Sequence, residues 1–152
     1  MKTYFLVLLL LLTTACTRGP IAKAVLDDEV RRLCAIDGGI KVYETVTLPA
    51  VEYDRYAKRN WVLPRKEEAK PTDLYYNVST THFYLEGNPQ MARQQHSVVR
   101  RSDKKILGEM IVYGRGGGDL TGPWHGSSFY CPDLTKLPGL EASVFIKGDR
   151  PR

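Results

Sequence analysis

Residues 114–132 read GRGGGDLTGPWHGSSFYCP, a composition unlike that of the rest of the chain. This stretch holds six of the 13 glycines, one of the two tryptophans and one of the three cysteines. A run of three glycines is costly in backbone entropy, so it is expected where φ is positive or another segment approaches closely. We therefore predict an ordered loop that Cys131 links to Cys34, near the start of the domain.

The segment before this loop begins with a helical pattern. Apolar residues in 21–36 recur at the spacing of one helix face, and Asp-Gly-Gly at 37–39 is a typical helix end. Residues 40–48 alternate and are β-branched, which predicts a strand. Glu44 falls on the apolar face of that strand, so we expect it at a sheet edge or paired with an arginine. A short helix is predicted to begin at Pro49.

The remainder of the chain is rich in strand signals. Strands are predicted at 74–85, 93–101, 105–113, 128–131 and 140–147, with a tight turn at 102–104. The order of these elements predicts an α+β fold, in which the N-terminal helix packs on an antiparallel meander of about five strands with one disulfide.

The N-terminus has the features of a secretory leader. Lys2 precedes a nine-residue apolar run, and small residues follow at 13–15. Such a run is too short to span a bilayer permanently, because a spanning helix needs about 20 residues. Residues 1–15 are therefore predicted to be a signal peptide.

The sequence Leu12-Thr13-Thr14-Ala15-Cys16 resembles the lipobox of bacterial lipoproteins, although Thr13 stands where that family prefers leucine. The resemblance implies that Cys16 is the lipid attachment site and the new N-terminus; an ordinary secretory signal cut nearby is the alternative. In the same family, Thr17 in place of aspartate implies the outer membrane, facing the periplasm, if the host is Gram-negative. The mature chain, and residues 113–132 in particular, is similar to small uncharacterised lipoproteins of Gram-negative bacteria, which implies no activity or ligand.

These assignments divide the chain into four parts. They are a signal peptide at 1–15, the lipidated cysteine and a tether at 16–20, a single α+β domain at 21–148, and a frayed tail at 149–152. Cys34 and Cys131 then remain as an even pair, which in an oxidising compartment predicts a disulfide. Two unpaired buried thiols are the alternative.

Charge and composition narrow the possible partners. The chain carries a net charge of +5, and removal of the leader leaves 21 basic and 17 acidic residues, a net charge of +4. Basic residues are spread along the chain, which indicates a solvated surface, with contact to an anionic lipid or lipopolysaccharide as the alternative. The partners expected are the membrane, another envelope protein or an anionic envelope component, and not nucleic acid.

The loop carries the candidate ligand-binding residues Arg115, Asp119, Trp124 and His125. The glycine run matches neither nucleotide-binding pattern, and the histidines lack metal-ligand spacing, so no cofactor, metal or catalytic residue is assigned. The sequence thus favours a lipid-anchored accessory or binding protein of the cell envelope over an enzyme. The alternative is a small envelope hydrolase that uses the Asp119/His125 loop.

Overall fold

The computed structural model describes residues 18–119 and 126–149 of the chain. It contains a 20-residue helix, α2 (Arg18–Asp37), followed by short helices and a sheet. The strands are β1 (Gly39–Val42), β2 (Val46–Leu48), β3 (Tyr75–Leu85), β4 (Gln90–Arg100), β5 (Ile106–Gly116), β6 (Ser128–Cys131) and β7 (Phe145–Lys147). The shorter helices are α3 (Ala50–Ala57), the 3-10 turn η1 (Leu134–Lys136) and α4 (Leu140–Val144).

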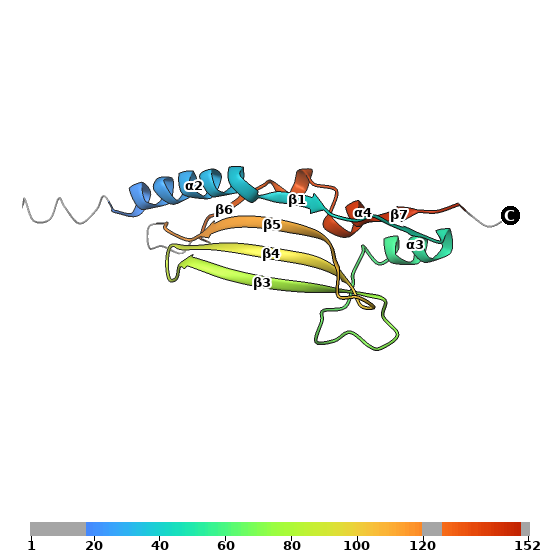
Figure 1. The fold of residues 1–152 in the computed structure, drawn as a ribbon. Coiled ribbons are helices and arrows are strands. Elements are labelled where there is room, and N and C mark those ends of the chain that lie inside the picture. Colours follow the sequence, from blue (N-terminus) through green and yellow to red (C-terminus); the bar gives the residue numbers. More distant parts are fainter. Residues whose placement is uncertain (1–17, 120–125, 150–152) are drawn as a thin grey trace, which may run out of the picture.

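The main sheet has five strands, all paired antiparallel, in the order β1-β5-β4-β3 (Figure 1). Strand β6 also pairs with β5, along residues 113–116, whereas β1 pairs with residues 108–111. Since β4 occupies the other side of β5, β1 and β6 lie end to end on the same edge. The predicted α+β class, with a helix on a mostly antiparallel sheet and one disulfide, is confirmed.

Helix α2 packs on the end of the sheet where β5 and β6 meet (Figure 1). A cluster of buried side chains joins the helix to the strands; its members are Val30, Cys34, Met91, Ile111 and Tyr113. Of the apolar residues in this helix, Val30 is fully buried and Val25 is exposed. The helix begins at Arg18, so residues 18–20 belong to it and not to an extended tether.

A second cluster fills the opposite end of the sheet, where α3, α4 and β7 gather (Figure 1). Its buried members are Leu48, Leu63, Tyr75, Val98, Leu107, Leu140, Val144 and Phe145. The Phe145 ring stacks on Trp61 with centroids 5.8 Å apart and meets Tyr75 edge-on at 4.9 Å. Strand β7 pairs in parallel with β2, which forms a small second sheet.

Two predicted strands are wrong in part. Residues 40–48 break into β1 and β2, because the chain leaves the β5 edge after Val42 and joins β7 instead. Residues 140–147 form helix α4 followed by β7, because Leu140 and Val144, four residues apart, face the same core. Glu44 lies in the break, and its carboxylate is 2.5 Å from the guanidinium of Arg100. The predicted pairing of Glu44 with an arginine is therefore confirmed.

Strand β5 runs to Gly116, so the first three residues of the predicted 114–132 loop are in the sheet. The predicted strand at 128–131 is confirmed as β6. Among the helices of residues 18–119 and 126–149, none has the length and apolar character needed to cross a bilayer.

Candidate functional site

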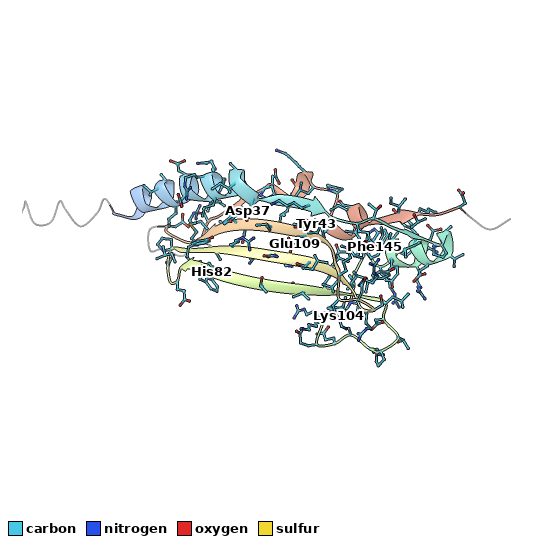
Figure 2. All side chains as sticks on the ribbon, in the orientation of Figure 1. Asp37, Tyr43, His82, Lys104, Glu109 and Phe145 are labelled. Atoms are coloured by element: carbon cyan, nitrogen blue, oxygen red, sulfur yellow. A yellow bond between two sulfur atoms is a disulfide. The ribbon has the colours of Figure 1, made fainter. Side chains whose placement is uncertain are left out.

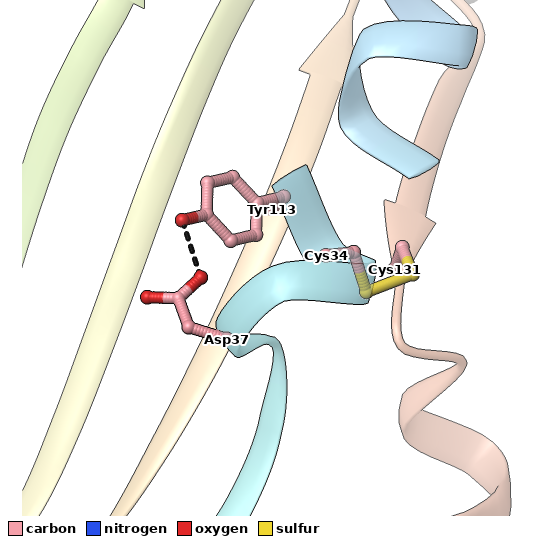
Figure 3. The surroundings of a disulfide bond; sticks show 4 residues. All are labelled: Cys34, Asp37, Tyr113 and Cys131. Atoms are coloured by element: carbon pink, nitrogen blue, oxygen red, sulfur yellow. Dashed lines mark hydrogen bonds between the residues drawn. A yellow bond between two sulfur atoms is a disulfide. The ribbon is translucent and has the colours of Figure 1, made fainter. Parts of the chain in front are cut away.

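The predicted disulfide between Cys34 and Cys131 is confirmed, with Cα atoms 5.9 Å apart (Figure 3). It links the last turn of α2 to the end of β6. A methyl group at Gly38 would lie 2.7 Å from both the Sγ and the carbonyl oxygen of Cys34. The glycine after the helix is therefore required for the close approach of the chain to the disulfide.

The end of α2 is also held by hydrogen bonds to the sheet. The Tyr113 hydroxyl donates to Asp37 at 2.7 Å (Figure 3), and the Arg93 guanidinium donates to the other carboxylate oxygen at 3.1 Å. Burial, together with the bond to Asp37, raises the pKa of Tyr113 well above its usual value. Burial opposes ionisation of Asp37, but the bonds from Tyr113 and Arg93 outweigh it and lower the pKa of this carboxyl.

Arg115 lies near the end of β5, and its side chain is only 2% exposed. Its Nε donates to Asp27 of α2 at 2.7 Å. One terminal nitrogen donates to the carbonyls of Gly117 and Ser127, at 2.6 and 2.9 Å, and to the Ser127 hydroxyl. The guanidinium thus joins the helix to both ends of the loop, and its donors are engaged within the chain.

Asp119 is similarly engaged. Its carboxylate lies 2.7 Å from Lys23 Nζ, and it accepts bonds from the backbone N–H and the hydroxyl of Ser127. The bond from Lys23, followed by those from Ser127, lowers the pKa of Asp119 to about 2. Trp124, His125 and the predicted lipid attachment site Cys16 lie outside the described residues. Of the four candidate ligand-binding residues, the structure therefore brings Arg115 and Asp119 together, on either side of Ser127.

A row of hydrogen-bonded polar side chains leads from Asp37 to Glu109 and Tyr43, which are labelled in Figure 2. Arg93 donates to Gln95 at 2.7 Å, and Gln95 donates to Glu109 at the same distance. Tyr43 donates to the other oxygen of Glu109, a bond that raises the pKa of the tyrosine. Each described member has a partner within the row, so the row ties α2 and Tyr43, the residue after β1, to β4 and β5.

A basic hollow lies at the other end of the sheet, beside the turn that joins β4 to β5. It has a volume of about 420 Å³ and is lined by Lys66, Tyr76, Arg101 and Lys104. Sequence reasoning missed it, because these residues come from a connector, a strand and a turn. The available signal was the turn sequence RRSDKK at 100–105, which has four cations and one acid.

Comparison of the chain with protein-family models, curated proteins and solved structures gives no match. Within the described residues, no three histidine, cysteine, aspartate or glutamate side chains gather as a metal site would require.

Proposed function

We propose that this chain is a lipid-anchored accessory or binding protein of the cell envelope, held in the outer membrane and facing the periplasm. The observation that carries the proposal is the pairing of two of the three cysteines. Cys34 and Cys131 are joined to each other, which leaves Cys16 as the third cysteine, directly after the small residues that end the leader. A disulfide also favours an oxidising compartment over the cytosol.

The start of α2 supports attachment close to a membrane. Only Thr17 separates Cys16 from the first residue of the helix. A lipid on Cys16 would thus place the described domain near the bilayer surface rather than on a long stalk. The partners proposed are the membrane and either another envelope protein or an anionic envelope component.

The hydrolase alternative is the weaker candidate. It requires Asp119 as a catalytic group, and the carboxylate of Asp119 is bound by Lys23 and Ser127. A carboxylate held in this way stabilises the loop, and its lowered pKa makes it a poor proton acceptor.

The anchor is tested by growing a bacterial host with radiolabelled palmitate. We expect the full chain to incorporate label and Cys16→Ser to incorporate none, because the serine hydroxyl cannot form the thioether. The matched control is the double variant Cys34→Ser/Cys131→Ser, which removes two thiols but keeps Cys16 and should remain labelled. Equal labelling of the wild type and Cys16→Ser would refute the anchor.

A further inference from the structure

The turn between β4 and β5 divides its four cations into two pairs with different surroundings. Arg100 pairs with Asp103 at 2.7 Å and with Glu44, and Lys105 pairs with Glu44 at 2.6 Å. The charges of Arg100 and Lys105 are thus neutralised by neighbouring carboxylates. Arg101 and Lys104 have no ion pair with any residue in the described part of the chain, and both line the basic hollow.

The floor of the hollow is the ring of Tyr76, which is 5% exposed. The Arg101 guanidinium lies 5.6 Å from the ring centroid and the Lys104 ammonium lies 5.8 Å from it. Arg101 is fixed by a 2.7 Å bond from its Nε to the carbonyl of Asp73, which leaves its two terminal nitrogens unbonded to any described residue. These nitrogens present a planar pair of donors of the kind that binds oxyanions.

The third cation reaches the hollow from the connector before β3. The backbone N–H of Lys66 donates to the carbonyl of Asn77 at 2.9 Å, which holds the lysine beside Tyr76. The lining therefore consists of three cations and a tyrosine, without a carboxylate. Like charges that converge without a counter-ion repel one another, and an anion placed among them would relieve that repulsion.

Lys104 occupies an unfavourable backbone position. Its φ is +61°, in the left-handed region that glycine and asparagine favour (the residue is labelled in Figure 2). A lysine at this position carries a conformational cost that asparagine would reduce, and its side chain contributes to the hollow. Lys104 thus destabilises the backbone of the turn, while its ammonium group adds positive charge to the hollow.

We propose that this hollow binds a phosphate group, with Lys66, Arg101 and Lys104 as its ligands and Tyr76 as its floor. Three cations suit a dianionic oxyanion better than a single carboxylate, and the arginine fork matches phosphate geometry. The proposal concerns the folded domain and does not depend on a lipid at Cys16. The same chemistry is offered by free phosphate and by the headgroup of a phosphomonoester lipid.

The test is a titration of the full chain in neutral detergent, followed by the backbone amide NMR signals of Tyr76, Arg101 and Lys104. We expect inorganic phosphate, but not chloride at the same ionic strength, to shift these signals with saturation. Lys104→Asn should weaken phosphate binding about tenfold, the effect of losing one charged hydrogen bond. Its thermal midpoint should equal or exceed that of the wild type, since asparagine tolerates the left-handed backbone.

Lys105→Gln is the matched control, because it removes the same charge from the adjacent residue, which faces Glu44. It should bind phosphate as the wild type does. Equal weakening by Lys104→Asn and Lys105→Gln would show attraction by net charge alone and would overturn the proposal, as would the absence of saturable shifts. A soluble short-chain phosphatidate that binds more tightly than inorganic phosphate would identify a lipid headgroup; equal affinities would identify the phosphate group itself. Either result supports the site.

Discussion

Arg115 joins helix α2, the end of β5 and the segment before β6 through one buried guanidinium. Its contacts with Asp27, Gly117 and Ser127 are of three kinds: a carboxylate, backbone carbonyls and a hydroxyl. A buried charge is stabilising only while its partners are in place, because removal of one partner leaves the others desolvated and unpaired. This makes Arg115 a residue whose role in stability can be measured directly.

We expect Arg115→Met to lower the free energy of unfolding by about 3–5 kcal/mol, since it leaves the Asp27 carboxylate without its main partner. Urea unfolding followed by circular dichroism measures this change. Arg32→Ala is the control, because its pair with Glu29 is exposed and screened by solvent, so its loss should change the free energy of unfolding little. A loss below 1 kcal/mol for Arg115→Met would contradict the structural role, whereas Arg115→Met/Asp27→Leu should recover part of the stability.

Helix α4 packs against β5 at a position that only glycine fits. A methyl group on Gly108 would lie 2.8 Å from the Val144 side chain, 3.1 Å from the Lys41 carbonyl and 3.3 Å from Leu140. The close contact is what brings Leu140 and Val144 into the cluster around Phe145. The short helix is thus positioned by a residue more than 30 places earlier in the chain.

Gly108→Ala should lower the free energy of unfolding by about 1–3 kcal/mol, the usual cost of overfilling a packed core. Gly114→Ala in the same strand is the matched control. Its methyl group would lie 2.7 Å from the ring of Tyr130 and 3.7 Å from the Phe129 carbonyl, but Tyr130 is 51% exposed and can turn toward solvent, so a smaller loss than that of Gly108→Ala is expected. Val144→Ala should restore part of the stability of Gly108→Ala, and a failure to do so would place the strain elsewhere.

These elements also mark how far the sequence could predict the structure. Helix α2, strands β3 and β6 and the disulfide follow from local patterns and from cysteine number, so their prediction was correct. Residues 140–147 are a short apolar run, whose periodicity fits a helix or a strand equally well. As a helix, the segment places Leu140 and Val144 against Gly108, and no local pattern contains that contact.

The candidate sites show the same difference between local patterns, which the sequence reveals, and contacts between distant residues, which it does not. The loop residues Arg115 and Asp119 could be identified from composition, but their partners Asp27 and Lys23 lie about 90 residues earlier and had no sequence signal. The basic hollow depends on which cations of the 100–105 turn are neutralised. Arg100 and Lys105 are both neutralised by Glu44, which lies in the break between β1 and β2.

At the scale of the whole molecule, the disulfide connects helix α2 to strand β6. Cys34 and Cys131 are 97 residues apart, so the disulfide restricts most of the unfolded chain. In the chain-entropy account, a loop of this length stabilises the folded state by about 4–5 kcal/mol. The disulfide is therefore expected to contribute about as much to the free energy of unfolding as Arg115 does, but it acts by restricting the unfolded state.

We expect Cys34→Ala/Cys131→Ala to lower the free energy of unfolding by about 4–5 kcal/mol, measured by urea unfolding without reductant. Addition of reductant should lower the stability of the wild type by a similar amount and leave the double variant unchanged. A wild type that is equally stable with and without reductant would contradict the predicted contribution of the disulfide.

The disulfide also decides how the folded chain would respond to tension. If the chain is pulled at one point before Cys34 and another after Cys131, the load passes from α2 directly through the sulfur atoms into the segment after β6. The segment between the cysteines, about 330 Å of chain if extended, lies off the path of the force. Only the helix before Cys34 and the elements after Cys131 could lengthen. The main strands and the basic hollow would keep their shape while the ends of the domain were drawn out.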